Sequence, residues 1–203
     1  RSRYLDYLER TRDKLREQAE HARNTALALH PSPAGIVSFI HDPERLWERR
    51  RSDADHLQAR IGMATVPWFT LNVPTSESPV EPIDPILLRE AEMLTSSHSS
   101  IEAMPATADL REAAVVAVIG PRERTIPMIR ALVMQLTAHQ LPEDLELAAA
   151  FPVEHARDWR GFDLLPHVHD PNLFDGPVPA RRVAPTLDAL SDILASEMAE
   201  RSA

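Results

Sequence analysis

The sequence predicts an α/β fold with a mainly parallel sheet, preceded by a helical stalk. Three features support this fold class: a long charged helical stretch at the start, two short apolar strands in the second half, and an amphipathic helix between those strands. A strand, a helix and another strand in succession are typical of a right-handed βαβ unit with two parallel strands. We therefore expect a helical stalk over residues 1–30 and an α/β domain over residues 31–203.

The stalk is expected to be one helix over residues 2–29. Apolar side chains recur there every three, four or seven residues on a strongly charged background, which gives a narrow apolar stripe. His30-Pro31-Ser32-Pro33 ends this helix, because a residue before proline disfavours the helical conformation. Two short helices are expected next, the second with Asp42 as its N-cap and Pro43 at its first position.

The middle of the chain alternates between apolar and polar residues over 58–63 and 66–73, which predicts two strands in a possible hairpin. Residues 74–83 form a polar linker with several prolines. Asp84-Pro85 begins a helix that extends to about residue 96. The sequence pattern over residues 104–110 predicts a strand only weakly.

The strongest strand signal is the β-branched run over residues 114–119. A helix over residues 122–139 and a strand over residues 145–151 follow it. A loop with three prolines and a glycine near residues 170–179 leads to a last helix over residues 186–200. The expected buried positions of the two helices are Ile129, Leu132, Val133 and Leu136, then Leu187, Leu190, Ile193, Leu194 and Met198.

The segment that ends at Gly120 resembles the start of a phosphate-binding loop but lacks its chemistry. A P-loop has a second glycine five residues after the first, then Lys, then Ser or Thr, which enclose the phosphates and hold magnesium. Those places hold Thr125, Ile126 and Pro127 here. Proline has no amide hydrogen and isoleucine has no charge. We therefore predict a degenerate P-loop, RecA-like ATPase core without catalytic or nucleotide-binding residues.

A nucleotide-binding alternative depends on Arg122 or Arg124 in place of the lysine, at a helix N-terminus that attracts anions. Hydrolysis also needs a magnesium-binding acid at the end of a neighbouring strand. The strand over 145–151 ends instead in Phe151-Pro152-Val153, with Glu154 further along. An inactive loop is favoured, and a regulatory or active ATPase domain is the alternative.

Charge is distributed unevenly along the chain. Residues 1–60 hold 12 of the 22 basic and 10 of the 31 acidic residues, a net +2, and the remaining 10 basic and 21 acidic residues give −11. Nucleic-acid binding requires clustered positive charge, so the acidic part disfavours it. The arginine-rich start is compatible with an anionic membrane surface or with ordinary solvated helix charge. With no cysteine, the chain has no disulfide and no thiolate nucleophile.

His167-x-His169-Asp170 is the most metal-like run in the sequence, because alternate histidines beside a carboxylate can chelate. It lacks a second cluster that would complete four ligands, and His155 is the one nearby candidate. No serine lies in a Gly-x-Ser-x-Gly elbow. We therefore predict no metal, no cofactor and no catalytic residue, with a metal-dependent hydrolase as a remote alternative.

The run Leu46-Trp47-Glu48-Arg49-Arg50 has two interpretations. One is a docking surface or an arginine acting in trans on a phosphate. The other, which is favoured, is packing, with Trp47 buried and either Arg49 or Arg50 paired internally with Asp53 or Asp55. A docking surface would use Arg50 and Arg51. The candidate partner-binding residues are Trp47, Arg49, Arg50, Arg51, Asp53 and Asp55.

This run, followed by Asp53-x-Asp55 and Arg60-Ile61-Gly62, resembles the EccC family, the membrane-anchored FtsK/SpoIIIE-type ATPases of type VII (ESX) secretion systems in actinobacteria. The similarity is to the segment between the transmembrane helices and the first ATPase domain. Arg51 and His56 depart from it, since relatives usually carry proline and phenylalanine there. Further matches in order are Tyr4-x-x-Tyr7-Leu8, His30-Pro31-x-Pro33, residues 131–136, Leu141-Pro142-x-Asp144-Leu145, Leu165-Pro166-His167 and Gly176-Pro177.

The resemblance implies a domain at the cytoplasmic side of the plasma membrane, below upstream transmembrane helices, with an ATPase-like fold that departs from the Walker motifs. It implies a non-catalytic structural and coupling role between the membrane pore complex and three downstream ATPase domains that drive protein export. The implied partners are the other domains of the polypeptide and the membrane subunits, among them a pore component with ubiquitin-like domains. DNA translocation, known in the wider motor family, is disfavoured by the acidic charge.

Overall fold

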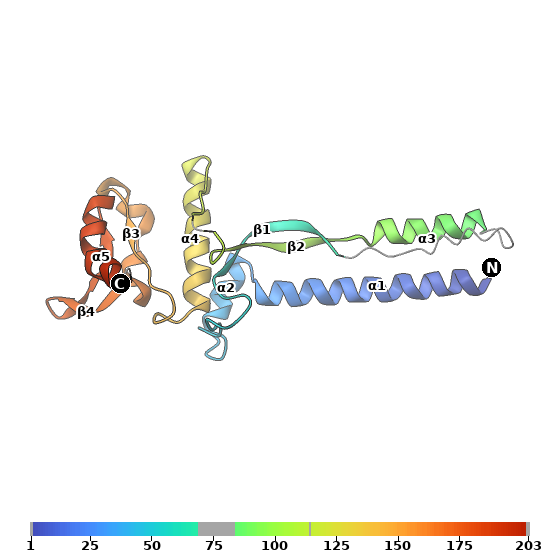
Figure 1. Ribbon diagram of the computed structural model, residues 1–203, viewed down its shortest axis with the longest axis horizontal. Coiled ribbons are helices and arrows are strands. Elements are labelled where there is room, and N and C mark those ends of the chain that lie inside the picture. The colour runs from blue at the N-terminus through green and yellow to red at the C-terminus, as the bar shows by residue number, and fades with distance from the viewer. Residues whose placement is uncertain (1, 69–83, 114, 202–203) are drawn as a thin grey trace. The chain divides into compact units, whose positions relative to one another are not determined.

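The computed structural model describes residues 2–68, 84–113 and 115–201 (Figure 1). The chain divides into two compact units, one of Arg1–Ser32 and Arg60–Thr107, the other of Pro33–Ala59 and Ala108–Ala203. The first unit thus joins the long helix to residues that the sequence analysis assigned to the second domain. The described residues contain both helices and strands, which agrees with the α/β class.

The first unit is built on two helices that lie side by side (Figure 1). Helix α1 (Ser2–Leu29) confirms the predicted stalk helix, and α3 (Pro85–Ser97) confirms the helix after Asp84. The side chain of Asp84 caps α3 by accepting a hydrogen bond from the amide of Ile86. The apolar stripe of α1 provides Leu8 and Leu15, which pack in one buried cluster with Ala91 and Leu94 of α3.

Strands β1 (Gln58–Pro67) and β2 (Ser100–Asp109) pair in a two-stranded sheet. The predicted hairpin of strands 58–63 and 66–73 is therefore wrong: β1 is continuous through Pro67 and pairs with β2. The weak strand predicted at 104–110 is part of β2. Residues 69–73 and the predicted linker 74–83 lie outside the described residues.

The second unit begins with α2 (Pro33–Phe39), the first of the two predicted short helices. The second predicted helix is a series of turns instead, although the Asp42 side chain accepts the amide of Glu44 as an N-cap would. The turns end at Trp47, whose φ of 59° is left-handed and cannot continue a helix. Tertiary contacts of Trp47 therefore override the local helix signal.

Helix α4 (Arg122–His139) confirms the predicted helix, and its C-terminal end is buried on all sides. Ile36 and Phe39 of α2 pack there against Ala138 and Met134. Of the four positions predicted to be buried, Leu136 is buried, while Ile129, Leu132 and Val133 are half-buried.

The predicted strand before α4 is wrong. Residues 115–119 pair with no strand of the described residues, and Val115 and Ile119 are 85% and 93% exposed. A βαβ unit around α4 is therefore not observed. Among the described ranges the strands form three two-stranded sheets, so the mainly parallel sheet is not observed and a degenerate P-loop core is not confirmed.

The only parallel pair among the described strands joins β3 (Ala149–Ala150) to β6 (Val183–Ala184). The predicted strand 145–151 is thus reduced to two residues. The predicted loop near 170–179 is an antiparallel hairpin of β4 (His169–Asp175) and β5 (Val178–Arg181), with Gly176 at φ 65° in its turn. Three 3-10 helices precede it: η1 (Val153–Trp159), η2 (Phe162–Leu164) and η3 (Pro166–Val168).

The last helix, α5 (Leu187–Arg201), confirms the prediction for 186–200. Its expected core face is wrong in part: Leu187 and Met198 are 74% and 60% exposed. A buried arginine, Arg182, connects to this helix instead. It is 3% exposed, and its Nε lies 2.7 Å from Glu197 Oε1, while Glu146 and Asp170 lie at 3.3 and 3.8 Å.

Candidate functional site

Residues 47–58 form a turn-rich segment, the Trp–Arg turn, which is attached to the C-terminal end of α4. The amide of Trp47 donates to the Ala138 carbonyl over 2.8 Å, and its indole Nε1 donates to the Thr137 carbonyl over 2.9 Å. These bonds hold Trp47 in a left-handed conformation that is rare for residues other than glycine. The turn is therefore shaped by its contact with α4.

Arg49 lies inside the Trp–Arg turn and is 2% exposed. Its Nε is 3.0 Å from Asp55 Oδ2, and its Nη1 donates to the carbonyls of Asp55 and Gln58 over 3.1 and 2.9 Å. Burial lowers the pKa of Arg49, and the Asp55 carboxylate opposes that shift. The guanidinium therefore closes the turn from within. The contacts that Arg49 makes here are internal, and the partner-binding role predicted for it stays a prediction.

Trp47, Asp53 and Asp55 also have internal contacts. The half-buried Trp47 ring meets the ring of His167 edge-on at 6.4 Å. Asp53 Oδ2 accepts the amide of Arg50 over 2.7 Å, and Asp55 holds Arg49. The packing interpretation thus describes the contacts that these side chains make. A partner-binding role for these three residues stays a prediction.

Arg50 and Arg51 lie at the surface of the same turn. Arg50 Nη1 donates to the Trp47 carbonyl over 3.0 Å. Arg51, whose side chain is 67% exposed, pairs with Asp144 at 2.7 Å and donates to the Glu143 carbonyl over 2.8 Å. Both cations are accessible, and their predicted role in partner binding stays a prediction.

Two residues of the site were missed from the sequence, Asp109 and Arg111. Arg111 donates to the carbonyl of Ala54 over 2.8 Å and pairs with Asp109 at 2.7 Å. Hydrogen bonds from Arg111 hold the pKa of Asp109 well below its usual range. The Asp-x-Arg spacing at the end of a predicted strand could have indicated that Asp109 and Arg111 pair with each other. It could not have indicated that Arg111 binds the carbonyl of Ala54.

The loop before α4 places Pro121 at the N-cap position, where no side chain caps the helix. The amides of Arg124 and Thr125 donate to the Pro121 carbonyl, and the Thr125 hydroxyl donates to the Arg122 carbonyl over 3.4 Å. Arg122, a predicted substitute for the P-loop lysine, is paired with Asp158.

Further along the same loop and helix, Gly120 is exposed before the first turn, Ile126 is half-buried, and Pro127 is exposed inside α4. These positions supply no cation, and Pro127 supplies no amide hydrogen. The absence of nucleotide binding at this loop stays a prediction.

The histidine run takes part in backbone contacts. His167 is buried and its Nε2 lies 2.9 Å from the Gln140 carbonyl, while His169 Nε2 lies 3.1 Å from the Asp163 carbonyl. Burial lowers the pKa of His167, which keeps it neutral. In the ranges that the structure describes, no three His, Cys, Asp or Glu side chains are grouped to hold a metal ion. None of the helices in those ranges combines the length and apolar character that crossing a bilayer requires.

Comparison with known proteins finds similarity along the whole chain. This chain is 34% identical over 206 residues to the ESX-3 secretion system protein EccC3 of Mycobacterium tuberculosis. The alignment covers 100% of this chain and 15% of that protein. The chain is 31% identical over 198 residues to the ESX secretion system protein EccC of Thermomonospora curvata, covering 98% of this chain and 15% of that protein. The ESX-4 protein EccC4 of M. tuberculosis is 29% identical over 193 residues. No family model matches the chain.

These relatives are all proteins of ESX secretion systems, and that is the class to which the chain belongs. Within that class it is a member of the EccC family. The chain spans about 15% of the length of these relatives.

Proposed function

We propose that this chain is a non-catalytic structural and coupling domain of a type VII secretion motor. It links the membrane complex to the downstream ATPase domains of the same polypeptide during protein export. Its partners are those domains and the membrane subunits, and it lies at the cytoplasmic side of the plasma membrane. The similarity to EccC proteins along the whole chain supports the setting in secretion.

The observation that supports the coupling role is that the Trp–Arg turn contains one buried arginine and two exposed arginines. Arg49 is used entirely inside the protein, where it closes the turn on Asp55 and Gln58. Arg50 and Arg51 lie beside it at the surface, on a segment fastened to the end of α4. The hydrogen bonds that hold the turn to α4 do not involve a partner protein. A turn that is held in this way and presents exposed cations is suited to transmit force to a neighbouring protein.

The residues at the start of α4 support the proposed inactivity of the domain. A phosphate loop needs a cation and free amides directed at one point. Here Thr125, Ile126 and Pro127 occupy the key places, and Arg122 is already paired with Asp158. Such a helix start lacks the groups that grip a triphosphate, so the domain transmits conformational changes that other domains generate.

The experiment is an export assay in a full-length EccC protein that carries this segment. Arg50→Ala combined with Arg51→Ala is expected to reduce export of the system's substrates by about tenfold or more, because two interface cations are lost. The melting temperature of the 203-residue chain with the same substitutions should stay within about 2 °C of the unmodified chain. Arg10→Ala with Arg16→Ala, which removes two exposed arginines of α1, is the matched control. Unchanged export by the Arg50/Arg51 variant would contradict the proposal.

A further inference from the structure

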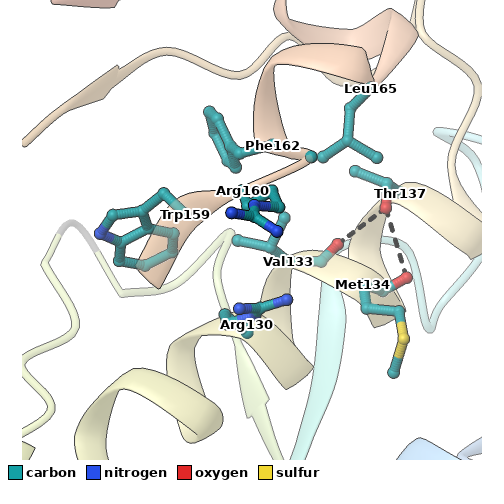
Figure 2. A pocket seen from close by; sticks show the side chains of 9 residues that line it. Arg130, Val133, Met134, Thr137, Trp159, Arg160, Phe162 and Leu165 are labelled. Carbon is teal, nitrogen blue, oxygen red and sulfur yellow. Dashed lines mark hydrogen bonds between the residues drawn. The ribbon is translucent and has the colours of Figure 1, made fainter. Parts of the chain in front are cut away.

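A small pocket of about 200 Å³ opens between α4 and the segments η1 and η2 (Figure 2). Its walls are mostly apolar. Helix α4 provides Val133 and Met134, and the facing segments provide Trp159, Phe162 and Leu165. Thr137 also lines it, but its hydroxyl turns back to the carbonyls of Val133 and Met134 over 2.9 and 3.3 Å, as the dashed lines of Figure 2 show. The pocket therefore offers an apolar interior.

The aromatic wall of the pocket is built as a unit. Trp159 stacks on Phe151 with ring centroids 5.8 Å apart, and Phe162 meets Trp159 edge-on at 6.1 Å. Gly161, at φ 86°, makes the turn that brings Trp159 and Phe162 together. Each ring is supported by the others, so the wall exists before any ligand binds. Preorganised aromatic walls are typical of sites that anchor a partner side chain.

Two arginines, Arg130 and Arg160, line this apolar pocket, and no acidic residue of the described ranges lines it (Figure 2). Arg130 donates to the backbone carbonyl of Asp158 over 2.8 Å but pairs with no carboxylate of the described residues. Arg160 forms no ion pair with any described residue either. Two cations beside an apolar surface repel each other and attract an anion more strongly than in open water. Two arginines without a carboxylate partner are unusual in a part of the chain whose net charge is −11, from 10 basic and 21 acidic residues beyond residue 60.

The size of the pocket selects the kind of ligand. Small-molecule sites usually enclose about 300–1,000 Å³, and this pocket is smaller, with room for one large side chain. A cavity that shares Arg130 and Met134 continues along α4 and adds the exposed cation Arg157 together with Asp158, whose carboxylate pairs with Arg122. A peptide can place one apolar side chain in the pocket and extend along this second cavity.

We infer that the pocket binds an acidic segment of a partner protein, whose apolar side chain inserts beside Trp159 while neighbouring carboxylates pair with Arg130 and Arg160. A free phosphate would not use the aromatic wall. The inference does not depend on the coupling role proposed above, because it concerns a different surface of the same unit.

The test uses the 203-residue chain and a fluorescein-labelled peptide in which phenylalanine and leucine are flanked by two glutamates on each side. We expect binding with a Kd on the order of 100 µM, measured by fluorescence anisotropy, because one anchor and two ion pairs give modest affinity. A peptide with lysines in place of the glutamates, and one with glycine and serine in place of the apolar pair, should each bind at least about tenfold more weakly. Raising the salt concentration should also weaken binding.

Arg160→Glu is the diagnostic variant, because Arg160 is exposed and its loss breaks no internal ion pair among the described residues. It should weaken binding of the acidic peptide by about tenfold or more. Arg124→Glu makes the same charge change at an exposed position of α4 that lines neither cavity, and it should leave binding unchanged. Trp159→Ala should also abolish binding, provided that its melting curve shows a folded chain.

Equal effects of Arg160→Glu and Arg124→Glu would overturn the proposal, because binding would then follow net charge alone. Equal binding of the three peptides would overturn it as well. Displacement of the acidic peptide by a short single-stranded oligonucleotide at equal concentration would assign the site to nucleic acid. Displacement by millimolar inorganic phosphate would reduce it to an anion site.

Discussion

Arg49 and Asp55 form an ion pair in the interior of the Trp–Arg turn, with Nε and Oδ2 3.0 Å apart. The arginine side chain is 3% exposed and the aspartate side chain is 26% exposed. Solvent therefore reaches the carboxylate of the pair but not the guanidinium. This relationship explains why two adjacent arginines of one motif differ in role. Arg49 maintains the turn, and Arg50 is presented by it.

Substitution of Asp55 should therefore destabilise the protein. Asp55→Ala leaves the buried Arg49 without its carboxylate and is expected to lower the free energy of unfolding by about 2–4 kcal/mol. Chemical denaturation followed by circular dichroism measures this value. Arg50→Ala removes an exposed cation from the same turn and should cost no more than about 1 kcal/mol. Similar losses for the two variants would contradict the distinction between them.

Arg182 should behave like Arg49, at a different place in the fold. Replacing it with alanine leaves Glu146, Asp170 and Glu197 close together without a cation, so we expect a loss of about 3–5 kcal/mol in urea unfolding. The neighbouring Arg181 is the matched control. It pairs with Asp163 at 3.3 Å but is 47% exposed, so Arg181→Ala should cost less than about 1 kcal/mol.

Stability should depend on pH through His167. Its folded-state pKa is lowered by burial below the ordinary value of 6.5, so the unfolded chain binds a proton that the folded chain does not. The contribution of the neutral histidine is thus complete above about pH 6.5 and decreases as the pH falls below that value. His167→Gln retains a donor for the Gln140 carbonyl and should flatten the stability profile between about pH 5 and 7. An unchanged slope in this variant would assign the dependence to other groups.

The exposed segment 115–119 gives a prediction that separates the observed structure from a P-loop core. Ile119→Thr changes a side chain that is 93% exposed, so the free energy of unfolding should change by less than about 0.5 kcal/mol. In a buried central strand the same substitution would cost about 2–4 kcal/mol, because it places a hydroxyl in the core. A large loss would show that this segment is a core strand in solution.

Local signals in the sequence were sufficient for three of the helices, α1, α3 and α4. The apolar stripe of α1, the Asp84 cap of α3 and the amphipathic pattern of α4 all predicted elements that the structure contains. Such signals act within a few residues, and they failed after Asp42, where the tertiary contacts of Trp47 override them. The strands were less predictable, since a β-branched run such as 115–119 reveals propensity but not whether a partner strand lies beside it.

The site was predictable only where its contacts join residues that are close together in the sequence. The sequence indicated that an arginine near Trp47 pairs with Asp53 or Asp55, and spacing alone could not decide which. The bonds from Trp47 and Arg49 to the end of α4 join residues about 90 positions apart, and nothing local encodes them. The three carboxylates around Arg182 lie 12 to 36 positions from it in the sequence and were also missed.

The central proposal, that this domain transmits force without using a nucleotide, is tested most directly by titrating the 203-residue chain with Mg-ATP in a calorimeter and then assaying phosphate release. We predict no heat of binding at nucleotide concentrations up to about 1 mM, a limit that corresponds to about −4 kcal/mol of binding free energy, and no release above the rate in buffer. Micromolar binding together with measurable turnover by this chain alone would contradict the account.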